Sequence, residues 1–235
     1  MTERIRTEKI NKTYNYKGKV IPTLADMDLH VGHHEFVSLI GPSGCGKSTL
    51  LNIFAGLETY GGKLTVNGTT CLMPQNDSML PWRNVYRNIC LPQEISGLKK
   101  PKGDIDALVE EFGLKGFEEA MPYELSGGMR KRAALLRTYL TEGDIMLLDE
   151  PFAALDTITR RKMSEWLLDI WQRHKKTVVF VTHDIEEAIF LSDRVYVFSR
   201  RPARVLDCIR IDTQRPRRRS DPDFAIHFEK IYGLL

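Results

Sequence analysis

Short apolar runs recur along the chain, and segments with helically spaced apolar residues lie between them. Continuous apolar runs are typical of strands that are buried on both faces of a parallel sheet. The clearest runs are residues 36–41, 144–150, 177–183 and 194–199. The clearest helical patterns are residues 47–57, 160–175 and 184–192. This alternation predicts an α/β fold with helices on both faces of a mostly parallel sheet.

Two regions depart from this alternation. Residues 19–36 and 61–70 contain short alternating runs with glycine turns, which predict antiparallel strands beside the parallel core. Residues from about 86 to 143 are mainly helical in pattern and interrupt the core. We therefore expect one domain over residues 1–235. Its catalytic core would comprise about 1–85 and 144–235, and a helical subdomain would be inserted at about 86–143.

Composition narrows the class of protein without deciding it. The 235 residues are 42% hydrophobic and 28% charged, as in an ordinary globular protein, and the net charge of +3 does not by itself indicate nucleic acid. The four cysteines include no CxxC pair, so a reduced compartment fits better than a disulfide framework or a zinc site. The polar N-terminus is unlike a signal peptide, and no apolar run approaches the roughly 20 residues of a membrane span. We expect a soluble protein that can still sit on a membrane partner.

A glycine-rich segment, "GPSGCGKST", follows the first predicted core strand and opens a predicted helix. It fits the pattern G-x-x-x-x-G-K-[ST], whose glycines let backbone N–H groups surround phosphates while the helix N-terminus adds positive potential. Lys47 would reach the β- and γ-phosphates, and the Ser48 hydroxyl would bind Mg²⁺. The candidate nucleotide-binding residues here are Gly41, Pro42, Ser43, Gly44, Cys45, Gly46, Lys47, Ser48 and Thr49.

The run "IMLLDE" provides the acidic partner that such a phosphate loop needs. An apolar strand that ends in Asp149 brings a carboxylate to the sheet edge, where Mg²⁺ would lie. Glu150 follows directly, so the two carboxylates can divide the work. Asp149 would serve the metal, while Glu150 would orient or deprotonate the attacking water.

A further motif, "LSGGMRKR", narrows the family. A serine and two glycines before a helix form a second anion-binding concavity. Together with the phosphate loop, Gln75, "IMLLDEPFAALD" and His183 in this order, the sequence resembles the ATP-binding subunits of ABC transporters. The resemblance implies a RecA-like P-loop NTPase core and two subunits that associate head to tail. Each ATP would lie between the phosphate loop of one subunit and the signature residues of the other, which are Leu125, Ser126, Gly127, Gly128 and Met129.

The resemblance also implies roles for single residues. Gln75 would sense Mg²⁺ and the attacking water, and His183 would contact the γ-phosphate. Asp156 would lie in the loop that crosses to the other subunit. Tyr14 would stack on adenine, although Tyr16 is an alternative and a core role for either tyrosine stays open.

Two residues of these motifs vary or depart from the family pattern. Lys131 stands where relatives often have glutamine, and we expect it to lie outside the phosphate contact and to have a small effect. Cys45 is either a tolerated small residue, which we favour, or an oxidation-sensitive thiol near the positive helix end.

The segment after Gln75, "NDSMLPWRNVYRNICLP", is similar to that of importers for nitrate, taurine and alkanesulfonates. The similarity implies that Leu80, Pro81 and Trp82 dock on a membrane subunit; the alternative is that Trp82 packs under the helical insert.

The sequence thus predicts an ATPase that uses ATP and Mg²⁺ to power import of a small nutrient. Its partners would be a second copy, two integral-membrane permease subunits and, indirectly, an extracytoplasmic substrate-binding protein. It would sit peripherally on the cytoplasmic face of the cell membrane. The alternative is a soluble ABC ATPase acting on nucleic acid or the ribosome, which the short chain with one cassette disfavours.

Residues 200–219 carry a net charge of +6, which we interpret as a solvated surface rather than a nucleic-acid or lipid site. The transported substrate and ATP-independent dimerisation are not encoded in any motif.

Overall fold

The computed structural model describes residues 3–97, 100–215 and 217–235. Within these residues the strands form two sheets, of six and of three strands. The larger has the order β5-β6-β7-β3-β8-β9, in which β9 alone runs antiparallel to its neighbour. Its strands are β3 Phe36–Ile40, β5 Thr70–Met73, β6 Ile145–Asp149, β7 Thr177–Thr182, β8 Arg194–Phe198 and β9 Val205–Arg210. The four strands expected from the apolar runs are confirmed, and so is the α/β P-loop fold.

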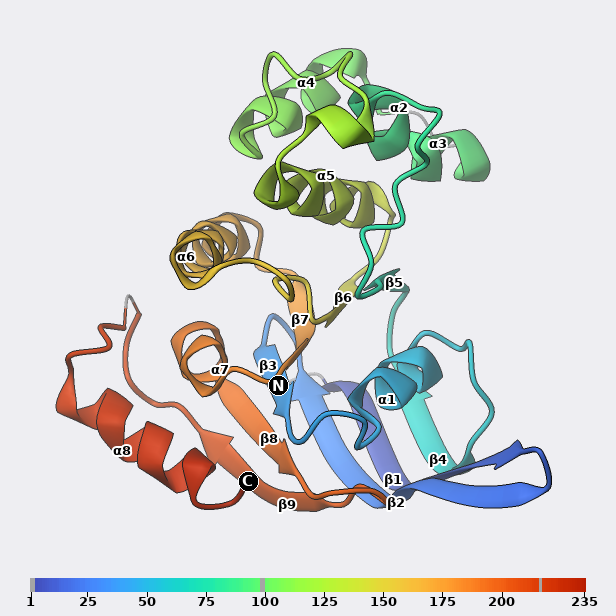
Figure 1. The fold of residues 1–235 in the computed structure, drawn as a ribbon, viewed down its shortest axis with the longest axis vertical. Coiled ribbons are helices and arrows are strands. Elements are labelled where there is room, and N and C mark those ends of the chain that lie inside the picture. The colour runs from blue at the N-terminus through green and yellow to red at the C-terminus, as the bar shows by residue number, and fades with distance from the viewer. Residues whose placement is uncertain (1–2, 98–99, 216) are drawn as a thin grey trace.

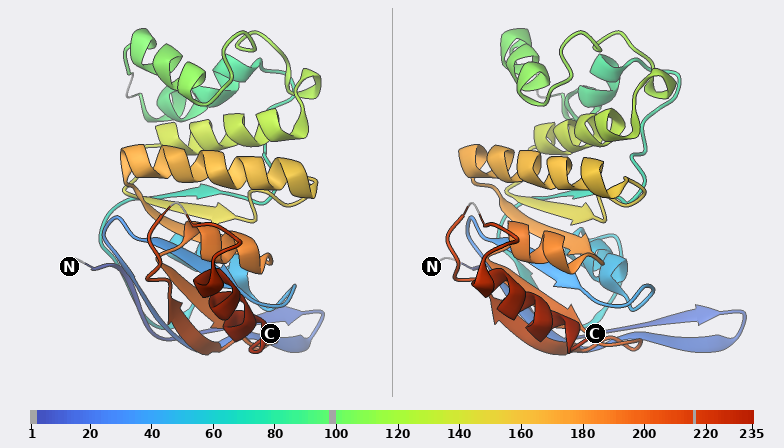
Figure 2. Two further views of the ribbon diagram at one scale, coloured as in Figure 1. Left: turned by 90° about the vertical axis from the view of Figure 1, so that its left-hand side faces the viewer. Right: turned by 60° about the vertical axis from the view of Figure 1, so that its left-hand side comes forward.

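The smaller sheet is antiparallel and has the order β2-β1-β4. Its strands are β1 Glu3–Tyr16, β2 Lys19–Gly32 and β4 Gly61–Val66. The expected antiparallel strands are confirmed, but β1 was not predicted, because two of its inward positions are the polar Thr7 and Lys12. Lys12 can be buried because its ammonium lies 2.7 Å from the Glu58 carboxylate. In Figure 2 the hairpin of β1 and β2 extends away from the rest of the molecule.

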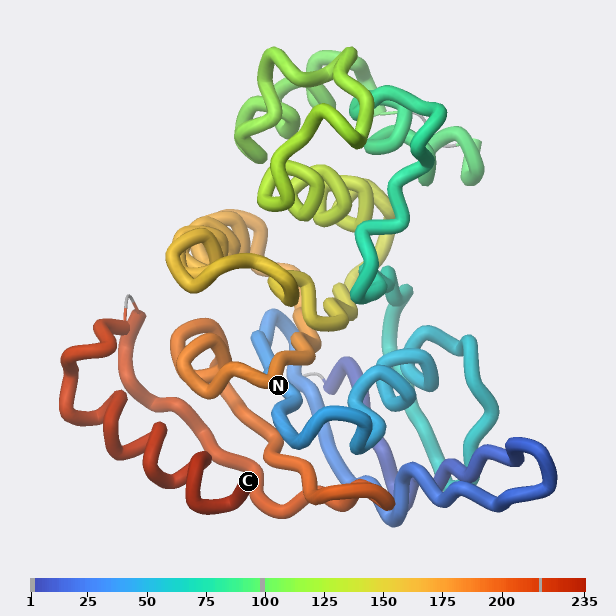
Figure 3. The backbone as a smooth tube through the Cα atoms, viewed as in Figure 1, coloured from blue at the N-terminus to red at the C-terminus, as the bar shows by residue number. Residues whose placement is uncertain are grey.

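The helices fall into two groups (Figure 1). Those that pack on the sheets are α1 Lys47–Phe54, α6 Thr157–His174, α7 Ile185–Leu191 and α8 Pro222–Tyr232. Those that form the separate helical region at the top of Figure 1 are α2 Val85–Ile89, α3 Leu91–Ser96, α4 Lys102–Glu111, the 3₁₀ turn Pro122–Glu124 and α5 Gly127–Leu140. The chain enters this region directly from β5 and returns through α5 to β6 (Figure 3). No helix within the described residues is both long and apolar enough to cross a bilayer.

The parallel sheet is apolar on both faces, which explains its continuous apolar strands. Along β7, Val178 and Phe180 join the core beneath α5, α6 and α7, whereas Val179 and Val181 join the core beneath α1 and the smaller sheet. Neighbouring residues of a strand point to opposite faces, so an apolar run fills both cores.

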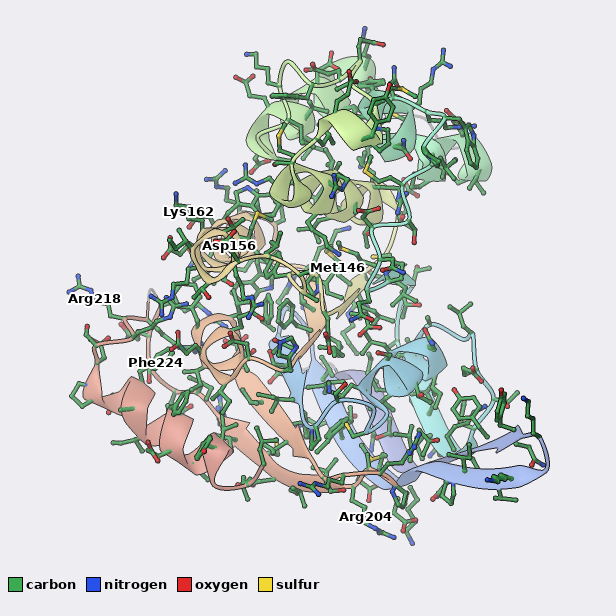
Figure 4. The ribbon with its side chains drawn as sticks, in the orientation of Figure 1. Met146, Asp156, Lys162, Arg204, Arg218 and Phe224 are labelled. Carbon is green, nitrogen blue, oxygen red and sulfur yellow. The ribbon has the colours of Figure 1, made fainter. Side chains whose placement is uncertain are left out.

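The arginine-rich segment after β8 is largely paired within the chain. Arg217 is 4% exposed and donates to the carbonyls of Ile189, Phe190, Ser192, Ile211 and Thr213. Three of these carbonyls lie at or just beyond the C-terminal end of α7, where the helix dipole is negative. Burial lowers the pKa of Arg217 to about 10. The expectation of a solvated surface is therefore wrong for Arg217, although Arg218 points away from the protein in Figure 4.

Replacing Arg217 with methionine should destabilise the protein, because it keeps the aliphatic stem but leaves five carbonyls without their donor. We expect a loss of about 3 kcal/mol and a melting temperature lower by about 5–10 °C. Calorimetry measures the melting temperature of Arg217→Met and compares it with that of Arg218→Met, a substitution at the exposed neighbouring position. Equal melting temperatures for the two variants would contradict the buried role.

Candidate active site

The phosphate loop lies between the end of β3 and the first residue of α1. Gly46 has a φ of 128°, and a Cβ there would lie 2.7 Å from a methyl of Leu24, so glycine is required. Lys47 is 5% exposed, and its ammonium donates to the carbonyls of Gly41 (2.8 Å) and Pro42 (3.1 Å). The N-cap position of α1 is Gly46, so no N-cap side chain competes with a ligand for the first amides of the helix. Such an arrangement suits a phosphate group.

The strand β6 brings Asp149 to this loop. The Ser48 hydroxyl donates to Asp149 Oδ1 at 3.0 Å. Burial raises the pKa of Asp149, and the neighbouring Glu150 carboxylate adds to the shift, while the Ser48 hydrogen bond and Lys47 oppose it. A hydroxyl and a carboxylate oxygen at one point are the hard ligands that Mg²⁺ prefers. Ser48 and Asp149 therefore fit the metal expected from the sequence.

Glu150 lies at the centre of a group drawn from three segments. Gln75 Nε2 donates to Glu150 Oε2 at 3.3 Å, and His183 Nδ1 lies 3.4 Å from the same oxygen. The register of the sheet brings these segments together, since Met73 pairs with Leu148 and Asp149 pairs with Val181. A carboxylate held between an amide and an imidazole can orient and accept a proton from a nearby water.

A cavity of about 290 Å³ lies over the phosphate loop. Its lining includes most of the expected residues and two that the sequence did not indicate, Thr23 and Arg201. Neither belongs to a recognised motif, so no sequence signal could have found them. The expected residues Gly41, Pro42 and Cys45 do not line the cavity. Its lining residues are Tyr14, Thr23, Ser43, Gly44, Gly46, Lys47, Ser48, Thr49, Gln75, Glu150 and Arg201.

The two tyrosines differ in position. Tyr14 lines the cavity, with its hydroxyl 3.5 Å from Thr49 Oγ1 and the Lys12 ammonium 4.8 Å from its ring centre. Tyr16 is 61% exposed near the hairpin turn. The geometry favours Tyr14 for contact with a base.

The signature residues lie outside this cavity. Ser126 caps α5 by accepting a hydrogen bond from the Met129 amide, and it remains exposed. Gly127 lines a different cleft of about 530 Å³, together with Gln75 and residues 153–155. Leu125 is 4% exposed and packs in the core, so its side chain does not reach a ligand surface, which corrects its place among the candidate contacts. The signature residues therefore do not line the cavity over the phosphate loop, although Gln75 borders both openings.

Comparisons with known proteins agree with this arrangement. The family model described as "ABC transporter" matches residues 24–153. The chain belongs to the ABC transporter family. Over its whole length it is 41% identical to an uncharacterized ABC transporter ATP-binding protein of Methanocaldococcus jannaschii, covering 92% of that protein.

Two further relatives have names that state a cargo. An aliphatic sulfonates import ATP-binding protein of Bacillus subtilis is 40% identical over 91% of this chain and 87% of its own length. A taurine import ATP-binding protein of Rhizobium johnstonii is 41% identical over 93% and 90%. An ATP-binding cassette solved as a dimer in a post-hydrolysis state with ADP and Pi superposes with a TM-score of 0.77 at 26% identity, covering 89% of this chain and all of that one. This chain is an ATPase of the ABC type.

In this ABC ATPase, Asp156 is the N-cap of α6. Its carboxylate accepts hydrogen bonds from the amides of Ile158 (3.1 Å) and Thr159 (3.0 Å). The Thr159 hydroxyl, and after it these amides, hold the pKa of Asp156 below the usual value. Figure 4 places it at the exposed start of the helix. Asp156 therefore stabilises the start of α6, independently of any contact with another chain.

Cys45 is 1% exposed, and burial raises the pKa of its thiol although Lys47 opposes the shift. A buried thiol of raised pKa is a poor nucleophile. The structure favours packing over oxidation sensitivity at this position.

Trp82 projects from the loop between β5 and α2. It is 71% exposed, which contradicts the alternative that it packs under the helical insert. The buried Asn88 fixes the loop: its amide donates to the carbonyls of Leu80, Arg83 and Asn84, and its oxygen accepts from the Leu80 amide. The loop is thus held in one shape with Pro81 and Trp82 exposed and Leu80 half-buried.

Glu187 is a buried carboxyl beside the His183 segment. It is 5% exposed, and its Oε2 accepts a hydrogen bond of 2.6 Å from Thr182. Burial raises its pKa to about 7, with Asp184 and Glu150 acting in the same direction and the Thr182 hydrogen bond and Arg160 opposing it. The folded state therefore holds a proton here that the unfolded chain releases near its ordinary pKa of 4.5.

This raised pKa predicts a pH-dependent stability. The contribution of the protonated Glu187 is fully present below pH 4.5 and is lost as the pH rises through about 7. Glu187→Gln removes the titration, so its stability relative to the wild type should improve by about 2–3 kcal/mol between pH 5 and pH 8.

Urea denaturation of both proteins at several pH values measures this difference. Glu165→Gln, on an exposed position of α6, is the matched control and should show a much smaller change. A difference between Glu187→Gln and wild type that does not vary with pH would contradict a titrating buried carboxyl.

Proposed function

We propose that this ABC ATPase powers an importer for small organic anions of the sulfonate or taurine type, or for a related nutrient such as nitrate. The observation that carries the proposal is the rigid loop that joins Gln75, at the catalytic carboxylate, to an exposed Trp82. The printed names of two relatives, importers of aliphatic sulfonates and of taurine, support the cargo class.

The catalytic step is hydrolysis of ATP. Lys47 and the N-terminal amides of α1 bind the phosphates, and Tyr14 contacts the base at the other end of the cavity. Ser48 and Asp149, with Gln75 nearby, would hold Mg²⁺, whose positive charge would offset that of the phosphates. Glu150 orients the attacking water and accepts its proton, while Gln75 and His183 hold the carboxylate in place.

Two copies of the chain complete two equivalent sites. Ser126 and the glycines after it lie apart from the chain's own phosphate loop, at an exposed helix N-terminus. A head-to-tail dimer would bring this end of α5 to the γ-phosphate held by the other copy. Asp156 lies at the start of α6, where its loop can contact the second subunit.

The assembly includes two integral-membrane permease subunits and, through them, an extracytoplasmic substrate-binding protein. The ATPase sits on the cytoplasmic face of the membrane, with Leu80, Pro81 and Trp82 against a permease. An exposed tryptophan on a fixed loop is typical of an interface anchor. The alternative, action on nucleic acid, is not favoured, because Arg204, Arg215 and Arg219 are paired with acidic residues of the same chain.

Glu150→Gln tests the catalytic assignment. The variant keeps the shape of the site but lacks a base, so hydrolysis should fall by about 10²–10⁴-fold while ATP binding persists. With ATP and Mg²⁺ it should accumulate as a dimer, measured by size-exclusion chromatography with light scattering. Adding Ser126→Arg to this variant should abolish the dimer. Turnover close to that of the wild type would refute the role of Glu150.

Trp82→Ala tests the docking assignment. Truncating a central interface anchor typically costs 2 kcal/mol or more, which is a loss of about 30-fold or greater in affinity. We expect less permease to copurify with the variant and less transport in proteoliposomes of the assembled complex. Ile226→Ala, which removes another exposed apolar side chain on α8, is the control. Unchanged copurification and transport in Trp82→Ala would refute docking through this loop.

A further inference from the structure

The loop that carries Gln75 is held by basic side chains of a single helix, α5. Lys131 Nζ donates to the Gln75 carbonyl at 2.6 Å. Arg137 donates to the carbonyls of Asp77 (2.6 Å) and Ser78 (2.9 Å). The backbone of residues 75–78 is therefore fastened to the helix that begins at the signature serine, although it follows a strand of the core sheet.

Lys131 holds the Gln75 end of this loop. Its side chain is half-buried between α5 and the loop, and the loss of water around the ammonium lowers its pKa, while the Asp77 carboxylate opposes that shift. A charged donor on a carbonyl makes a stronger hydrogen bond than a neutral one, especially where water is partly excluded. Because the acceptor is the carbonyl of Gln75 itself, this bond fixes the residue whose amide meets Glu150.

The contacts form a short chain between two ends of the subunit. Ser126 caps α5 at the exposed signature end, and Lys131 lies on the same helix only five residues later. Lys131 holds the Gln75 carbonyl, and Gln75 Nε2 donates to Glu150 Oε2 at 3.3 Å. A displacement of α5 thus moves Gln75 relative to Glu150, because the helix is rigid over one and a half turns.

We propose that Lys131 is a positioning residue that couples the signature helix to the catalytic carboxylate of its own subunit through Gln75. The proposal rests on the proposed ATPase dimer, in which the signature end of α5 meets the other copy's nucleotide. When the signature end of α5 contacts the nucleotide held by the other copy, Lys131 places Gln75 against Glu150. Nucleotide bound at the other copy's phosphate loop thus makes this subunit's own site competent for hydrolysis. This revises the expectation that lysine in place of glutamine has a small effect, because the ammonium contacts the backbone of a catalytic segment rather than a phosphate.

The test is a double-mutant cycle with steady-state ATPase kinetics on the full chain. Lys131→Met keeps the aliphatic stem and removes the donor. It should lower kcat about 10-fold, a factor that matches the loss of one charge-assisted hydrogen bond, while KM for ATP changes less than about twofold. Lys131→Arg keeps a charged donor and should retain most of kcat.

The cycle separates coupling through Gln75 from a general loss of packing. In a Gln75→Ala background, Lys131→Met should change kcat less than about twofold, because the side-chain amide through which it acts on Glu150 is already absent. Lys162→Met, on a lysine that points outward from α6 in Figure 4, is the matched control and should match wild type. Melting temperatures of all variants identify any that fail to fold.

Each possible outcome supports or overturns the positioning role of Lys131. Wild-type kcat in Lys131→Met, or additive effects of the two substitutions, overturns the positioning role while Glu150→Gln still reports an intact ATPase mechanism. Normal turnover in Gln75→Ala would instead overturn the catalytic assignment of Gln75, and the role of Lys131 with it. A lowered kcat, a steady KM and non-additivity together support the coupling.

Discussion

The parallel pairing of β3, β7 and β6 is the constraint on which the site depends. Ile40 is level with Thr182, and Val181 is level with Asp149, so the three strands end at one edge of the sheet. The next residues along each strand are the first glycine of the phosphate loop, His183 and Glu150. The hydrogen bond from the Glu150 amide to the Val181 carbonyl, 3.1 Å long, extends this pairing into the site. Candidate catalytic groups far apart in sequence therefore meet through backbone register, and apolar packing on both sheet faces maintains that register.

Several basic side chains bond backbone carbonyls that would otherwise lack donors. Arg217 would be costly to bury alone, but it is surrounded by carbonyls that would themselves lack donors. Lys131 and Arg137 bond carbonyls of the Gln75 loop, as Arg217 bonds carbonyls at the end of α7. In both places a basic side chain satisfies backbone acceptors. A basic composition in this protein therefore serves the backbone of loops and helix ends as much as its surface.

The sequence allowed the fold and much of the site to be predicted, because both rest on local patterns. The strands of the parallel sheet are continuous apolar runs, and the phosphate loop and Asp149 lie directly at strand ends. The strand β1 escaped prediction because Lys12 occupies an inward position and depends on the distant Glu58. Arg201 and Thr23 line the cavity without any motif, and their positions follow from tertiary packing. The contact of Lys131 with Gln75 joins residues 56 positions apart, so no local pattern could reveal it.

The backbone of the loop before α2 is held separately from its exposed side chains. Asn88 holds that loop through main-chain atoms of Leu80, Arg83 and Asn84, and none of these bonds involves the side chain of Trp82. The bonds that hold the loop and its exposed side chains are therefore chemically independent. Side chains at positions 81 and 82 can change during evolution without altering the backbone that presents them, and a preformed loop loses little conformational entropy when it binds. In the proposed assembly, substituting two or three exposed residues would adapt the same backbone to a different membrane protein.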